Sequence, residues 1–175
     1  MAVLKNEMLD TLFQRRSIRK YKPEMISEDE LETILQAGIW APSGMNRQSC
    51  RLVVIRQPER LKRLYALAME FPNRGGNPFY DAPLAVIAFA NSTATSPVQD
   101  ASLAIGNMAN AAASIGVGSC WINCVKDLFQ TPEGREFKKE ICPEEEYMPV
   151  GSLILGYADE QPQPKPREEG RIRFY

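Results

Sequence analysis

The apolar run Leu84-Ala85-Val86-Ile87-Ala88-Phe89 constrains the fold of this chain more than any other segment. It lacks the polar alternation of a half-exposed strand, so it is typical of a central β-strand covered on both faces. A stretch rich in alanine follows over residues 98–115 and ends at Gly116, which is suited to stop a helix. Its small side chains permit close approach of another backbone. We therefore expect a helix at the centre of the fold or at a subunit interface.

Shorter patterns predict the remaining elements. Met8, Leu9, Leu12 and Phe13 recur at helical spacing. Ser27 and Glu30 form a capping-box pattern for a helix that ends near Gly38. Further helices are expected from Pro58 and from Thr131, strands over 52–55, 119–122 and 150–157, and a loop over 71–81.

The order of these elements predicts the fold class. Helices and strands are interleaved without a clean βαβ series, which favours an α+β layered sandwich. We expect a mixed, mainly antiparallel sheet flanked by helices, in a single domain over residues 1–175. The prolines that follow Asp159 favour an extended C-terminal arm from about residue 159.

Composition excludes several classes of partner. The chain has 175 residues, 44% of them hydrophobic, which is enough for one sizeable core. Its net charge is −1, so no global field draws it to nucleic acid or to an anionic membrane. No apolar run approaches the roughly 20 residues that span a bilayer. The first residues lack a signal-peptide core, so we expect a cytoplasmic protein.

Histidine is absent and cysteine is sparse. The four cysteines form no CxxC pair, so we expect reduced thiols rather than a disulfide framework. Without histidine, the chain lacks the commonest metal ligand and the commonest general acid or base, and we predict no metal site. If the chain is an enzyme, something other than an imidazole carries its proton or electron transfer.

Two basic clusters lie near opposite ends of the chain: Arg15-Arg16-Ser17-Ile18-Arg19 and Lys165-Pro166-Arg167. Arginine forks with a hydroxyl beside them suit the phosphate of a cofactor. We therefore hypothesise one anion site closed by both ends. The first cluster could also be a solvated helix end, where cations are favoured, or a nucleic-acid arm, which the balanced net charge disfavours.

Several motifs, taken in order, resemble the FMN-dependent nitroreductase family. They are Arg15-Arg16-Ser17-Ile18-Arg19-Lys20-Tyr21, Ala41-Pro42-Ser43-Gly44-Met45-Asn46-Arg47-Gln48, Gln99-Asp100, Gly116-Val117-Gly118-Ser119-Cys120-Trp121-Ile122, Ile154-Leu155-Gly156-Tyr157 and Lys165-Pro166-Arg167. The resemblance runs from about residue 8 to residue 167. It implies an α+β sandwich in an intertwined homodimer, with two flavins at the interface.

The resemblance also implies roles for particular residues. The phosphate and ribityl chain of FMN would be held by Arg15, Arg16, Ser17, Arg19, Lys165 and Arg167. The flavin would be reached from the partner subunit by Pro42, Ser43, Gly44, Asn46 and Gln48. The segment Trp121-Ile122-Asn123 would contact flavin N5, which carries the chemistry, so no side chain is assigned a catalytic role.

These roles predict an oxidoreductase that transfers reducing equivalents from NADH or NADPH to an electron-poor acceptor, such as a nitroaromatic or a quinone, in ping-pong turnover. Other flavin chemistry remains open: dehalogenation, flavin cleavage or dehydrogenation. A non-enzymatic, flavin-binding redox sensor is a further alternative. The chain departs from the family at Ser49-Cys50, where members often have Pro and an aromatic residue, and at Asn123-Cys124.

Overall fold

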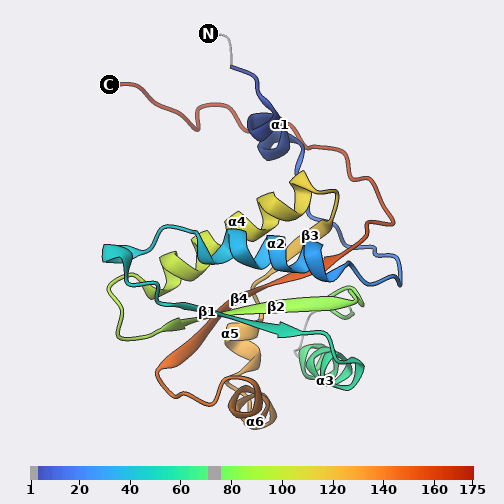
Figure 1. Cartoon of the computed structure of the whole chain (residues 1–175), viewed down its shortest axis with the longest axis vertical. Coiled ribbons are helices and arrows are strands. Elements are labelled where there is room, and N and C mark those ends of the chain that lie inside the picture. Colours follow the sequence, from blue (N-terminus) through green and yellow to red (C-terminus); the bar gives the residue numbers. More distant parts are fainter. Residues whose placement is uncertain (1–3, 71–75) are drawn as a thin grey trace.

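The computed structural model describes residues 4–70 and 76–175. A four-stranded sheet in the order β1-β2-β4-β3 forms its middle layer (Figure 1). The strands are β1 (Cys50–Ile55), β2 (Leu84–Asn91), β3 (Gly118–Ile122) and β4 (Tyr147–Gly156). Neighbouring strands pair antiparallel, and the parallel contact within the described residues is a single bridge from Ser17 to Ser119. The expected α+β sandwich is confirmed.

Helices cover both faces of the sheet. Six α-helices and one 3-10 helix, η1, are found in the described residues: α1 (Glu7–Gln14), α2 (Glu28–Ile39), η1 (Gly44–Asn46), α3 (Pro58–Met69), α4 (Pro97–Ser114), α5 (Val125–Leu128) and α6 (Pro132–Ile141). In Figure 1, α2 and α4 lie on one face of the sheet, while α3, α5 and α6 lie on the other. Helix α1 lies beyond the end of α4, away from the sheet.

Strand β2 separates two hydrophobic clusters, as its continuous apolarity predicts. Val86 and Ala88 face the cluster built on α2 and α4, whereas Ile87 and Phe89 face the cluster built on α3, α5 and α6. Successive side chains of a strand point to opposite faces, so a strand buried on both sides has no position for a polar residue.

Local sequence signals set the helix ends. The Ser27 hydroxyl accepts from the Glu30 N–H, and the Glu30 carboxylate accepts from the Ser27 N–H, so the capping box is present. Gly116 adopts φ +80°, and the following Val117 N–H donates to the Ala112 carbonyl. This is a Schellman ending, in which a residue in the left-handed region terminates the helix.

One strand boundary needed correction, and two further features were not predicted from the sequence. Strand β4 begins at Tyr147 rather than at Val150, because a bulge in its pairing with β2 accommodates Pro149. Strand β1 is only half-buried for most of its length, because it lies at a sheet edge. The short helix α5 had no sequence prediction. The predicted loop 71–81 lies partly outside the described residues, and its described part contains turns.

No helix within 4–70 or 76–175 is both long and apolar enough to cross a membrane. From Asp159 onward the chain forms no helix or strand and extends past α1, as expected for an arm (Figure 1).

Candidate functional site

The basic segment after α1 runs beside the edge of the sheet. Arg15 caps α1, with its N–H donating to the Thr11 carbonyl. Two residues later the chain bridges to β3, where the Ile18 N–H donates to the Ser119 carbonyl at 2.9 Å. The predicted anion-binding residues are therefore held by main-chain hydrogen bonds and not by a mobile terminus.

A cavity of about 590 Å³ lies beside this segment. The end of α1, the end of α4, the start of β3 and the base of the arm all line it, and they contribute Arg15, Arg16, Ser119 and Glu160. Its volume falls within the range of about 300–1,000 Å³ typical of small-molecule sites. The cavity joins residues that are more than a hundred positions apart in the sequence.

Arg16 has an unsatisfied donor in this region. Its Nη1 donates to the carbonyls of Phe13 at 2.7 Å and Arg15 at 2.9 Å. Its Nε is buried and has no hydrogen-bond partner among the described residues. Since buried polar groups are nearly always paired, an acceptor such as a phosphate oxygen fits this position.

Opposite charges pair where the arm leaves the sheet. The main-chain N–H of Arg19 donates to the Glu160 carboxylate. In the neighbouring ion pair, Lys20 Nζ lies 2.9 Å from Asp159 Oδ2. The Arg19 guanidinium lies over the ring of Tyr80, 5.9 Å from its centroid. These contacts hold the base of the arm against the basic segment.

Cys120 lies behind the same segment. Burial raises the pKa of its thiol, while Arg19, Ser17 and Arg15 act in the opposite direction. The net shift is upward, so Cys120 is a protonated core thiol at neutral pH. None of the four cysteines forms a disulfide, and the described residues contain no cluster of three or more potential metal ligands.

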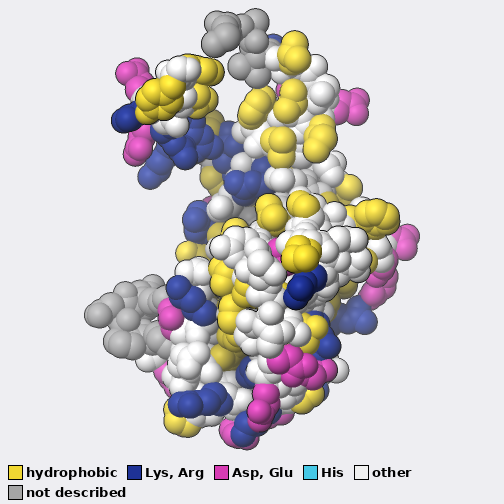
Figure 2. Space-filling model, turned by 90° about the vertical axis from the view of Figure 1, so that its left-hand side faces the viewer, with side chains coloured by type: hydrophobic (Ala, Val, Ile, Leu, Met, Phe, Trp, Pro, Cys, Tyr) yellow, Lys and Arg dark blue, Asp and Glu magenta, His cyan; other side chains and the backbone are white. Residues whose placement is uncertain are grey.

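Only part of the arm meets the basic segment. Residues Glu160 to Pro164 line the cavity together with Arg15 and Arg16. Lys165 and Arg167 are exposed and are not among its lining residues, and Arg167 lines a groove within the tail itself. Figure 2 shows dark blue Lys and Arg side chains gathered beside the tail and on the body below it. The convergence of both ends on one anion stays a prediction for Lys165 and Arg167.

Strand β3 links the anion region to Trp121. The Ser119 carbonyl points to the outer edge of the sheet, toward Ile18, and main-chain groups two residues apart point the same way. The N–H of Trp121 therefore faces the outer edge too. Asn123 follows about 13 Å along the chain from Ser119 at strand spacing. The indole of Trp121 is 44% exposed and lies over Gly151, where a Cβ would be only 2.7 Å from Nε1.

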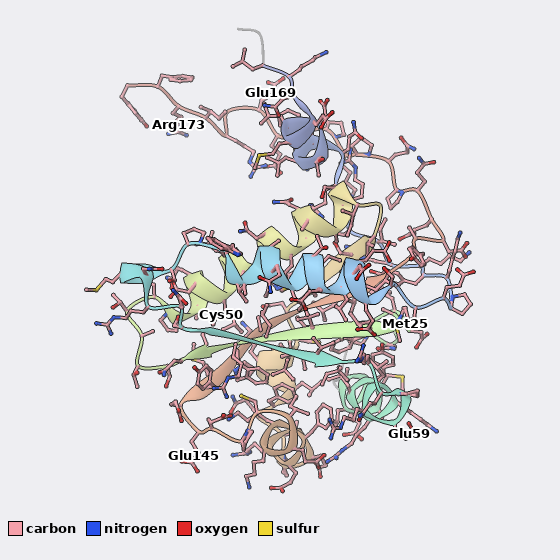
Figure 3. All side chains as sticks on the ribbon, viewed as in Figure 1. Met25, Cys50, Glu59, Glu145, Glu169 and Arg173 are labelled. Carbon is pink, nitrogen blue, oxygen red and sulfur yellow. The ribbon has the colours of Figure 1, made fainter. Side chains whose placement is uncertain are left out.

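The loop from Pro42 to Gln48 lies elsewhere on the same chain. It contacts Asp100 in the first turn of α4, whereas the cavity beside Arg15 is lined by Ala113 and Ser114 at the other end of that helix. Thirteen residues of helix correspond to about 20 Å. In Figure 3, Cys50 is labelled near the loop, and Glu169 and Arg173 are labelled on the tail, far from the loop.

The backbone of this loop is unusual. Met45, Asn46 and Gln48 are non-glycine residues with φ of 54°, 53° and 50°. The Ser43 hydroxyl accepts from the Gln48 N–H at 2.9 Å and helps to close the loop. Left-handed conformations of such residues cost about 1–3 kcal/mol each and cluster at functional sites.

Two residues at these sites have no role predicted from the sequence. Asp100 was noted only as part of a motif, although an acidic residue in the first turn of a buried helix signals a role for the carboxylate. Glu160 was missed, although the acidic pair at 159–160 complements the basic pair at 19–20 in the sequence.

Comparison with known proteins shows the family of the chain. The model of the nitroreductase family matches residues 12–157. A nitroreductase with bound FMN from Bacteroides fragilis superposes with a TM-score of 0.90 at 28% identity, over 98% of this chain and all of that one. The chain is 30% identical, over 91% of its length and 82% of the relative's, to a Methanothermobacter thermautotrophicus protein provisionally named NADH dehydrogenase/NAD(P)H nitroreductase.

An FMN reductase [NAD(P)H] from Bacillus subtilis is 27% identical to the chain, over 93% of its length and 70% of the relative's. The family match covers most of the chain, and the likeness to the B. fragilis structure extends over nearly all of it. The chain belongs to the nitroreductase family.

Proposed function

We propose that this protein is an FMN-dependent oxidoreductase that takes reducing equivalents from NADH or NADPH and passes them, in ping-pong turnover, to an electron-poor acceptor such as a nitroaromatic or a quinone. The observation that carries the proposal is the cavity between Arg15, Arg16 and β3, in a chain of this family. The FMN in the B. fragilis structure and the names of the two relatives support the cofactor and the donor.

The residues present fit FMN. Arg15 and Arg16, which line the cavity, would meet the phosphate, and the unpaired Nε of Arg16 would gain an acceptor. Ser17 and Arg19 are not among the lining residues, and their contact with the phosphate or ribityl chain stays a prediction. Hydrogen bonds to charged groups contribute about 1.5–3 kcal/mol each, so a few of them supply much of the roughly 8 kcal/mol of micromolar binding. When bound, FMN supplies the hydride chemistry. The outer-edge N–H of Trp121 would orient the ring, and the exposed indole would line the space for the acceptor.

We propose that the active form is a homodimer. Helix α1 has no buried residue, and its Met8 and Phe13 are 74% and 56% exposed. Figure 2 shows hydrophobic side chains gathered in that upper part of the molecule. A helix of eight residues is marginal alone, so its apolar face needs a cover. In a dimer, the loop from Pro42 to Gln48 would reach the flavin held by the partner subunit.

The proposal is tested by spectroscopy on the purified protein. We expect visible flavin absorbance that anaerobic NADH or NADPH bleaches, and that a nitroaromatic compound or a quinone restores. Absence of bleaching by both donors would refute the oxidoreductase. Recovery only by a halogenated substrate would identify reductive dehalogenation instead, and bleaching of the oxidised flavin by a saturated substrate would identify a dehydrogenase.

A further inference from the structure

A buried carboxylate lies beneath the loop that we assign to the flavin. Asp100 is 4% exposed and belongs to the first turn of α4. Its Oδ1 accepts from the Gly44 N–H at 2.9 Å, and its Oδ2 accepts from the Ser49 hydroxyl at 2.6 Å. Gly44 and Ser49 lie at the beginning and just past the end of the strained segment. One carboxylate thus ties down both sides of it.

The carboxylate of Asp100 is directed at the loop and not at its own helix. Ser96, the N-cap of α4, makes no side-chain capping hydrogen bond, and the Asp100 carboxylate accepts from Gly44 and Ser49 of the loop. A carboxylate suits a helix N-terminus, and the hydrogen bonds that it accepts are stronger than those of a neutral acceptor. A Cβ at Gly44 would lie 3.2 Å from Ser96 Oγ, so glycine permits this close approach.

Packing does not hold the loop from below. A cavity of about 240 Å³ lies under it, lined by Pro42, Ser43, Gln48, Cys50 and Asp100 among others. Cys50 is the first residue of β1, and it packs against the cluster built on α2 and α4. Burial and the charge of Asp100 raise the pKa of the Cys50 thiol to about 12, so Cys50 is uncharged there. Because the loop borders a cavity, its conformation depends on hydrogen bonds, those to Asp100 together with the one from the Gln48 N–H to the Ser43 hydroxyl.

We propose that Asp100 is a positioning residue for flavin binding: it holds the left-handed backbone of Met45, Asn46 and Gln48 in the conformation that presents the Asn46 and Gln48 amides to the flavin of the partner subunit. This inference rests on the proposed function, which brings the flavin to this loop. Asp100 itself does not touch the cofactor. It acts through the main chain of Gly44 and the hydroxyl of Ser49.

The test compares Ser49→Ala, Asp100→Ala and Asp100→Asn with the control Asn107→Ala. Asn107 lies on the same helix, and its side-chain amide donates to the Ala37 carbonyl at 3.2 Å, away from the loop. We expect S49A and D100A to raise the Kd for FMN about tenfold, as for one lost hydrogen bond to a charged group. They should also change the visible circular dichroism of bound FMN. D100N retains an acceptor for the Gly44 N–H, so most of the FMN affinity and of the circular dichroism of bound FMN should be retained.

The control should lower Tm without changing the flavin spectrum. Unchanged FMN affinity and spectrum in S49A, or an equal change in N107A, would overturn the positioning role even if D100A does not fold. Amide hydrogen exchange of residues 43–49 without FMN separates this inference from the proposed function. Faster exchange in S49A than in N107A supports the role whether or not flavin binds, and equal exchange overturns it.

Discussion

Glu160 lines the cavity that we assign to the FMN phosphate, and its negative charge should weaken binding there. Replacing it by glutamine removes the charge but keeps an oxygen that accepts from the Arg19 N–H, the contact that holds the base of the arm. We therefore expect Glu160→Gln to bind FMN more tightly than the natural chain. Removing the Glu160 carboxylate would therefore increase the affinity for FMN.

The size of the effect follows from the cavity. A volume of about 590 Å³ corresponds to a sphere of radius about 5 Å, so a phosphate inside lies about 7 Å from the carboxylate. At that distance two unit charges repel by about 2 kcal/mol at an effective dielectric constant of about 20, and by about 0.6 kcal/mol in water. Glu160 is exposed, so the lower value applies. With about −1.5 to −2 charges on the phosphate, we expect about 1 kcal/mol, or about fivefold in Kd.

The assay is fluorescence titration of the apoprotein with FMN and, in parallel, with riboflavin, which lacks the phosphate. E160Q should tighten FMN binding at low salt, lose most of that gain in high salt, and leave riboflavin binding unchanged. Glu169→Gln, on the tail outside the cavity lining, is the matched control. Weaker FMN binding by E160Q, or an equal gain for riboflavin, would show that the phosphate does not occupy this cavity.

Four further outcomes are expected. Arg19→Ala should raise the Kd for FMN about tenfold or more, measured by the same titration, with little change for riboflavin. Asn46→Ala and R19A dimers should each be impaired, whereas a co-refolded mixture should recover activity, because each mixed dimer contains one intact site; no recovery would contradict a site shared between subunits. Gly134→Ala should lower Tm markedly, because its Cβ would lie 2.0 Å from a backbone carbonyl oxygen, and an unchanged melting curve would disprove that packing. The capping-box hydrogen bonds lower the pKa of Glu30 below its ordinary value of 4.5, so their stabilisation is present above that pH and is lost on acidification; Tm should fall less between pH 5 and 3 in Glu30→Gln than in the natural chain.

Much of the fold could be predicted because its signals are local. The Ser27 capping box, the stop at Gly116 and the apolar run of β2 each depend on a few adjacent residues, and each was confirmed. Helix α5 is a single turn with no room for a periodic pattern, and the early start of β4 depends on a bulge opposite β2. Both features depend on contacts with other parts of the fold, which cannot be read from one segment of the sequence.

Some residues of the candidate site could likewise be predicted from the sequence, and others could not. Arg15, Arg16 and Ser17 could be selected by residue type, since phosphate recognition calls for cations and hydroxyls. Asp100 and Glu160 could not be ranked by type alone, because carboxylates are common and their roles arise from what they face after folding. The positions of Lys165 and Arg167 depend on the path of an extended arm, which local sequence does not determine.

Helix α4 gives a geometric reason for pairing two copies of the chain. Its first turn holds the strained loop through Asp100, and its last turn lines the cavity beside Arg15, about 20 Å away at helical rise. A rigid, buried helix between them fixes that separation, so one chain cannot bring its own loop to a ligand in its own cavity by bending. A second copy placed antiparallel along α4 would bring each loop to the other cavity and complete two equivalent sites at once. The exposed apolar face of α1, adjacent to the end of α4, is then the surface that such a copy would cover.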